Sequence, residues 1–133
     1  MSQQKSYFEQ QVDKIKKEVY QHEHYYKQVR HSRAYMAQHL SEKIELEKLA
    51  TTAFMSRYHF IRVFKQVYGL TPREYLKELR INKAKELLKD GLSVTQACFA
   101  VGYESLPTFS RAFKIGTGHS PRAYQELNKS NRE

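Results

Sequence analysis

The chain has 133 residues, of which 40% are hydrophobic, and a formal net charge of +9 at pH 7. This length fits one domain or two very small ones, with a compact core. The chain has no run of about 18 uncharged apolar residues and no apolar signal core near its start, so we expect no membrane span and no secretion, and a protein of the cytoplasm.

The first 29 residues carry a heptad pattern. Apolar side chains and one histidine follow one another by alternating steps of four and three: Phe8, Val12, Ile15, Val19, His22, Tyr26 and Val29. This spacing predicts a helix with one apolar face. Three roles are open for it: pairing with a second chain as a homodimer through residues 8–29, packing on its own domain, or continuing into the domain's first helix through "RAYMAQHL".

Two stretches further along the chain repeat each other. "FIRVFKQVYGLTPREY" (60–75) and "FSRAFKIGTGHSPRAY" (109–124) share half of their residues at an offset of 49. Upstream of each, an apolar stripe with the spacing of a short helix precedes a turn, at Leu46, Leu49, Ala50 and Ala53 in one copy and at Val94, Ala97, Cys98 and Val101 in the other. A short helix, a tight turn and a second helix form a helix-turn-helix, so two copies of this unit are predicted.

Local signals predict the ends of the second helix in each unit. Each copy has an N-cap serine before that helix and a glycine suited to a left-handed C-cap after it: Ser56 and Gly69 in one copy, Ser105 and Gly118 in the other. A further helix is predicted to start at Pro72 and to stop at Asp90-Gly91. At roughly 1.5 Å per residue, this helix would form a rod of about 27 Å between the two units.

The residues of the second unit carry a family resemblance. The tandem pair, the joining helix, "LSV", "VGYES", "FSRAFK" and the closing "GHSPRAY" resemble the DNA-binding domain of AraC/XylS-type bacterial transcription regulators, over Gln28 to Leu127. The resemblance implies an all-α fold and sequence-specific binding of double-stranded DNA, with two recognition helices in successive major-groove segments about 34 Å apart. The expected layout is an N-terminal amphipathic helix (1–27) and a tandem helix-turn-helix domain (28–128), the latter made of unit one (28–71), a linking helix (72–89) and unit two (92–128).

The resemblance also implies which side chains read bases. Carried over position by position, the base-reading set is Arg57, Tyr58, Ile61, Arg62, Leu106, Pro107, Ser110 and Arg111. Arginine can bind guanine O6 and N7 with two hydrogen bonds, and apolar members can meet thymine methyl groups. The alternative for both Arg62 and Arg111 is a phosphate contact or a solvated charge. The family often has polar residues such as glutamine where Leu106 and Pro107 stand, which puts base hydrogen bonding by the second unit in question.

The distribution of charge suggests where phosphates would bind. Beyond residue 27 the chain holds 18 Lys and Arg residues against 10 Asp and Glu residues, a balance suited to nucleic acid. The expected phosphate-binding set is Ser56, Lys65, Arg73, Lys83, Lys85, Ser105, Lys114 and Arg122. For the basic members, plain surface charge is the alternative role.

Other classes of function find little support in the sequence. It has no phosphate-cradling glycine loop, no nucleophile elbow and no paired His/carboxylate motif, so we expect no enzyme and no cofactor. The spacing of His22, His24 and His31, with no cysteine nearby, predicts exposed polar residues and no metal site. A protein-binding adaptor or anti-activator with the same fold is the alternative function.

Further partners follow from the resemblance alone. RNA polymerase is a candidate second partner of an activator of this kind, which would work at the bacterial nucleoid. The chain has no room for the ligand-binding barrel that many such regulators carry, so no small-molecule ligand domain is expected in it. It would be either a small stand-alone regulator or the C-terminal part of a longer one.

Overall fold

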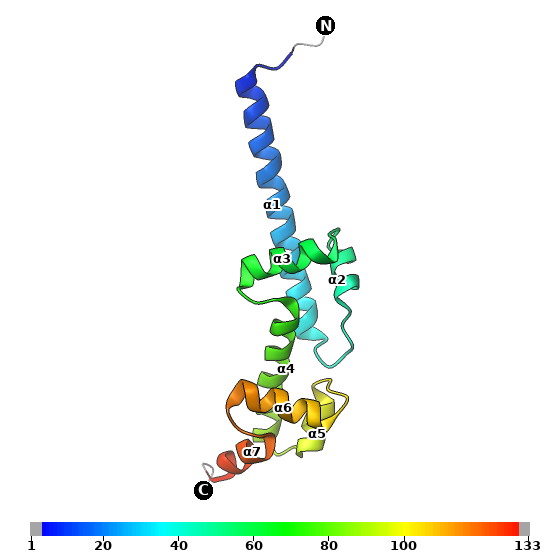
Figure 1. Ribbon diagram of the computed structural model, residues 1–133, viewed down its shortest axis with the longest axis vertical. Coiled ribbons are helices and arrows are strands. Elements are labelled where there is room, and N and C mark those ends of the chain that lie inside the picture. The colour runs from blue at the N-terminus through cyan, green and yellow to red at the C-terminus, as the bar shows by residue number, and fades with distance from the viewer. Residues whose placement is uncertain (1–3, 131–133) are drawn as a thin grey trace.

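The computed structural model describes residues 4–130, which form seven helices and no strand (Figure 1). The helices are α1 (Tyr7–Gln38), α2 (Leu46–Thr52), α3 (Arg57–Tyr68), α4 (Pro72–Lys89), α5 (Val94–Ala100), α6 (Leu106–Thr117) and α7 (Pro121–Ser130). The prediction of an all-α fold with two helix-turn-helix units and a joining helix is confirmed. None of the described helices, α1 included, is long and apolar enough to cross a membrane.

The molecule is elongated, with the two units placed one after the other along α4 (Figure 1). Unit one consists of the C-terminal half of α1 with α2 and α3, and unit two consists of α5, α6 and α7. Helix α4 contacts α1 and α3 at one end and α5, α6 and α7 at the other. Since one continuous helix contributes to both units, their separation is set mainly by the length of α4.

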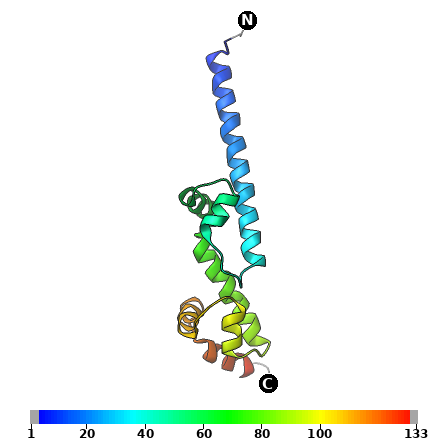
Figure 2. The ribbon, with the colours of Figure 1, turned by 90° about the vertical axis from the view of Figure 1, so that its right-hand side faces the viewer.

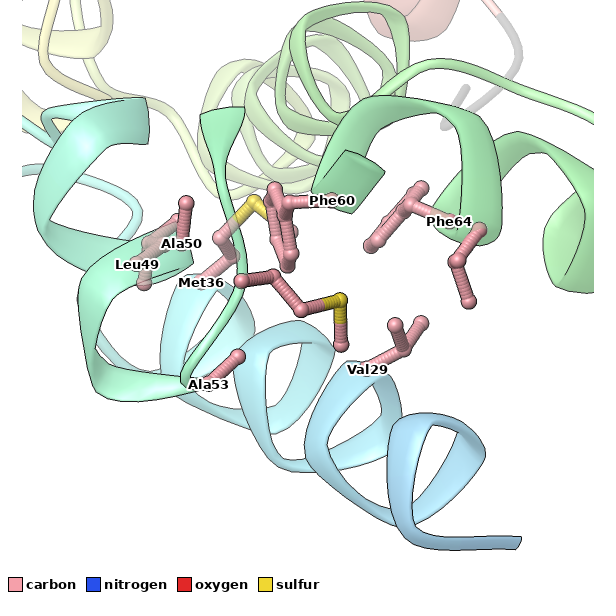
Figure 3. Packing of buried hydrophobic residues seen from close by; sticks show 9 residues of the cluster. Val29, Met36, Leu49, Ala50, Ala53, Phe60 and Phe64 are labelled. Carbon is pink, nitrogen blue, oxygen red and sulfur yellow. The ribbon is translucent and has the colours of Figure 1, made fainter. Parts of the chain in front are cut away.

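Each unit has its own hydrophobic core. The core of unit one gathers side chains from α1, α2 and α3 and the turn before α3 (Figure 3): Val29, Met36, Leu49, Ala50, Ala53, Met55, Phe60, Val63 and Phe64. The core of unit two is built from α4, α5 and α6 and the residue that ends α5: Ile81, Ala84, Leu88, Ala97, Cys98, Val101, Phe109, Ala112 and Phe113. The apolar stripes expected from the repeat therefore line two separate cores.

The duplication in sequence is also a duplication of packing. Phe60 and Phe64 have ring centroids 5.9 Å apart, and their counterparts Phe109 and Phe113 have centroids 5.7 Å apart. A tyrosine from the following helix meets the second phenylalanine edge-on in both units, at 5.6 Å for Tyr75 and 5.3 Å for Tyr124. Edge-to-face pairs of this kind add to the energy of simple burial.

The predicted helix ends are confirmed in both units. The hydroxyl of Ser56 accepts a hydrogen bond from the backbone N–H of His59 at 3.1 Å, and the hydroxyl of Ser105 accepts one from Thr108 at 3.3 Å. Both C-cap glycines adopt left-handed backbone, with φ of 75° at Gly69 and 82° at Gly118. Helices α3 and α6 therefore begin and end at equivalent positions.

Helix α1 is continuous from Tyr7 to Gln38, so the heptad segment extends into the first helix of unit one. The boundary expected between residues 27 and 28 lies inside this helix. Its C-terminal half is packed into unit one, where Val29 and Met36 are fully buried. Its N-terminal half projects away from both units (Figures 1 and 2), and Phe8, Ile15 and Val19 are 75%, 57% and 51% exposed. These three side chains therefore do not pack on their own domain.

The turn between α2 and α3 contains a strained residue. Phe54 has a φ of 58°, in the left-handed region, and its side chain is 81% exposed. Unit two has Gly102 at the equivalent position, with a φ of 94°. A left-handed backbone costs a residue with a Cβ atom roughly 1–2 kcal/mol, and glycine avoids this cost.

We therefore expect Phe54→Gly to raise the free energy of unfolding by about 0.5–1 kcal/mol, since little packing is lost with so exposed a side chain. Chemical denaturation followed by circular dichroism measures the change. Phe54→Ala is the control, because it removes the ring and keeps the Cβ atom, and it should give no such gain. Equal stabilisation by both substitutions would show that the ring, and not the backbone, is the source of strain.

Candidate nucleic-acid interface

Helices α3 and α6 lie on the same face of the molecule. They run nearly parallel across the long axis in Figure 1, and both are seen almost end-on at the left-hand side of Figure 2. Each has 12 residues, buries its phenylalanine face in its own core and leaves the opposite face exposed. A helix that is anchored on one side and free on the other, after a tight turn, has the form of a recognition helix.

The base-reading candidates on α3 lie on its open face. Arg57, Tyr58 and Arg62 are exposed, Tyr58 by 84%, and Ile61 is half-buried. Arg57 also forms an ion pair with Glu47 of α2, with 3.5 Å between Nη1 and Oε1. Surface pairs of this kind are weak, so the Arg57 guanidinium can exchange Glu47 for another anion at little cost.

The candidates on α6 are less polar. Leu106, Pro107 and Arg111 are exposed, and Ser110 is half-buried. The proline is tolerated because it occupies the first turn of α6, where backbone N–H groups have no partner inside the helix. Arg111 is thus the only long polar side chain among the four candidates on this helix.

A groove crosses α4 between the two recognition helices. One part of it, of about 500 Å³, is lined by basic residues of α4 and by α6, including Arg73, Lys77, Arg80 and Arg111. A second depression shares Arg73 and Leu76 with the first and extends to Arg57 at the start of α3. The two depressions together, which we call the α4 groove, run from α6 to α3. The part next to α6 is basic, and the part next to α3 also contains the carboxylates of Glu45 and Glu47.

Sequence reasoning missed Lys77, which lies in the α4 groove. The signal was available, because Lys77 follows Arg73 by four residues and shares its side of the helix. Lys85, which was among the expected phosphate ligands, does not line the groove. It is twelve positions from Arg73 and so lies about 120° around α4. Lys83 does not line the groove either, so Arg73 is the one member of the expected phosphate-binding set that does.

The remaining phosphate candidates differ in their surroundings. Lys65 follows Ile61 by four residues and Lys114 follows Ser110 by four, so each extends the open face of its helix by one turn. Arg122 is exposed in the first turn of α7, and Lys83 is exposed with its Nζ 3.3 Å from Glu86 Oε2. The hydroxyls of Ser56 and Ser105 cap α3 and α6, and Ser105 also donates to Thr108 Oγ1 at 2.9 Å.

Burial lowers the pKa of the Arg80 guanidinium from its ordinary value, yet an arginine in a protein stays charged. Within the part of the chain that the structure describes, no group of three or more His, Cys, Asp or Glu residues is placed to hold a metal ion. The chemistry that the groove and the two helices offer is the binding of an extended polyanion.

The amino-acid sequence is similar to a known family of domains and to a known regulatory protein. A family model described as a helix-turn-helix domain matches residues 49–127. The MmsAB operon regulatory protein of Pseudomonas aeruginosa is 39% identical over 94 residues, which cover 70% of this chain and 31% of that protein. The chain thus spans about a third of that relative's length.

Two solved structures are similar in three dimensions. The C-terminal domain of AraT, a response regulator from Geobacillus stearothermophilus, gives a TM-score of 0.72 at 33% identity and covers 75% of this chain and 84% of that one. The DNA-binding domain of AdpA, a global transcriptional factor solved in complex with a target DNA, gives 0.75 at 30% identity and covers 78% of this chain and 95% of that one. Each of these similarities covers more residues of this chain than one helix-turn-helix unit contains.

Proposed function

This chain belongs to the AraC/XylS-type family of helix-turn-helix transcription regulators, and from that premise we propose that it binds double-stranded DNA sequence-specifically and regulates transcription. One observation carries the proposal: α3 and α6 present open faces on the same side of the molecule (Figure 2), with the α4 groove between them. Such a monomer can place its two recognition helices in successive major-groove segments on one face of the duplex.

Roles follow for individual side chains. We propose that Arg62 and Arg111 bind guanines, that Tyr58, Ile61 and the other members of the base-reading set contact neighbouring base edges, and that Arg57 turns from Glu47 to the DNA. In the α4 groove, Arg73 and Lys77 bind the backbone that passes between the two major-groove segments. Lys65 and Lys114 bind phosphates beyond the ends of the base-reading rows.

The salt dependence of binding tests this function. If six to eight basic side chains neutralise phosphates, the logarithm of the binding constant should fall against the logarithm of salt concentration with a slope of roughly −5 to −7. Lys77→Gln should make the slope shallower by about 1, and Lys85→Gln, which removes the same charge outside the groove, should leave it unchanged. A mobility-shift titration in a salt series gives all three slopes. A wild-type slope near −1 would favour the protein-binding adaptor or anti-activator.

We further propose that the projecting half of α1 pairs with a second copy of the chain. Phe8, Ile15 and Val19 are exposed members of one heptad face. Such a face is usually buried against the same face of a second chain. Ile15→Glu should then convert a dimer to a monomer in analytical ultracentrifugation. Gln10→Glu places the same charge at an outer heptad position and should leave the dimer intact. Equal masses for the wild type and Ile15→Glu would reject this seam.

Other parts of the function rest on family membership alone. We propose RNA polymerase as a second partner at activated promoters and the bacterial cytoplasm, at the nucleoid, as the place of action. We propose no catalytic step and no bound cofactor for this chain.

A further inference from the structure

The loop between α1 and α2 belongs to unit one in sequence but reaches unit two in space. Leu40, two residues after the end of α1, packs against the core of unit two, which is built mainly from α4, α5 and α6. The loop therefore bridges the two units beside α4 and gives them a second connection.

Arg80, near the middle of α4, holds this loop by its backbone. Its Nε donates a hydrogen bond to the carbonyl oxygen of Leu40 at 2.8 Å, and its Nη2 donates one to the carbonyl oxygen of Glu42 at 3.0 Å. The guanidinium carbon also lies 5.8 Å from the centre of the Tyr103 ring, in the turn before α6. A planar fork of donors is needed to reach two carbonyls while facing an aromatic ring, and arginine alone among the side chains offers it.

Gly102 contacts the same loop from the side of unit two. A Cβ atom at this position would lie 3.0 Å from the carbonyl oxygens of both Leu40 and Ser41, which are backbone atoms held by Arg80 or next to it. The backbone of Gly102 also needs the left-handed region, with a φ of 94°. The loop can thus approach the turn between α5 and α6 this closely only because the residue there has no side chain.

Arg80, Gly102 and the loop at residues 40–42 form what we call the inter-unit latch. On DNA, a change of one base pair between two contacted segments moves them apart by about 3.4 Å and rotates them by roughly 35°, since a turn holds about 10.5 base pairs. A single helix such as α4 can bend and twist, whereas two connections side by side resist both. The latch therefore helps to fix the distance and the angle between α3 and α6.

We propose that Arg80 and Gly102 are positioning residues that restrict the protein to DNA sites with one spacing between the two recognised segments. The inference rests on the proposed function, because it assumes that both recognition helices contact DNA. It assigns Arg80 a role different from that of Arg73 and Lys77, since its donors are turned to the loop.

Binding to sites of altered spacing tests the proposal. A site selected from random DNA by the wild-type protein is lengthened or shortened by one base pair between the two segments, and affinities are measured for the three sites. The wild type should prefer its own spacing by tenfold or more. Arg80→Lys keeps the charge but cannot reach both carbonyls with a planar fork, and it should reduce that preference to within about threefold while leaving the salt slope unchanged.

Two controls separate positioning from general damage. Arg30→Lys makes the same exchange at an exposed position on α1 and should keep the wild-type preference. Gly102→Ala should lose the preference, whereas Gly91→Ala, which has a similar φ of 97° but no atom within 4 Å of the added Cβ, should retain it. Circular dichroism checks that each variant is folded. If Gly102→Ala does not fold, the result for Arg80→Lys tests the proposal by itself.

Each outcome has one meaning. Wild-type spacing preference in folded Arg80→Lys overturns the inference and leaves the proposed function intact. Equal weakening by Arg80→Lys at all three spacings also overturns it, since the latch would then only stabilise the fold. A wild-type protein that selects no DNA sequence overturns the proposed function and this inference together.

Discussion

Arg62→Ala is expected to relax base preference at one base pair of the selected site, and Arg111→Ala at another about one helical turn away, each at a cost of roughly 1–3 kcal/mol of binding free energy. Both side chains are exposed on the open faces of their helices, and within residues 4–130 neither has an ion-pair partner. Their guanidinium groups are therefore free to make two hydrogen bonds to a guanine. Selection from random DNA, followed by titration on single-base variants of the site, measures both effects.

The two costs should add in the double variant. Arg62 and Arg111 stand on separate helices with separate cores and share no contact, and substitutions at such independent sites are usually additive within about 0.5 kcal/mol. Arg30→Ala is the control, because it removes the same charge from α1 and should change no base preference. If Arg62→Ala and Arg111→Ala weaken all sequences equally, both arginines bind phosphates. If only Arg62→Ala shifts preference, unit two anchors the protein without reading bases, as Leu106 and Pro107 already suggest.

Phe113→Ala is expected to lower the free energy of unfolding by about 3–5 kcal/mol. The side chain is fully buried and packs against Phe109 and Tyr124, so its removal leaves a cavity in the core of unit two that the helices cannot easily close. Ile115→Ala on the same helix should change stability by no more than about 0.5 kcal/mol, because Ile115 is 72% exposed. Urea denaturation of both variants gives the comparison. A loss below about 1 kcal/mol for Phe113→Ala would mean that this core is loosely packed.

Much of the fold could be predicted because its signals are local. The cap at Ser56 is a hydrogen bond to His59, three residues away, and the left-handed glycines follow from backbone sterics at single positions. The apolar stripes depend on the helical period alone. The repeat then supplied each of these signals twice, and the open faces of α3 and α6 followed from the position of their buried phenylalanines.

The candidate site was less predictable where it depends on α4. Basic residues are frequent along this helix, and composition alone does not separate Lys77 in the groove from Lys85 outside it. The step of four residues from Arg73 places Lys77 on the same side of α4, but that this side borders the groove becomes known only when α6 is in place. The strain at Phe54 also appears only in the structure, although the repeat aligns this residue with Gly102.

What the sequence by itself determined was the number of units, the helices within them, their caps and the family. Those features arise from contacts between residues a few positions apart, and a family signature records them directly. Only the tertiary structure decided that α1 continues into unit one with its first half exposed, that the α4 groove joins α3 to α6, and that Arg80 holds the loop of unit one. These depend on atoms far apart in the chain, such as Arg80 Nε and the carbonyl oxygen of Leu40, forty residues away. The local pattern around either residue is compatible with many partners, and packing of the two units selects one.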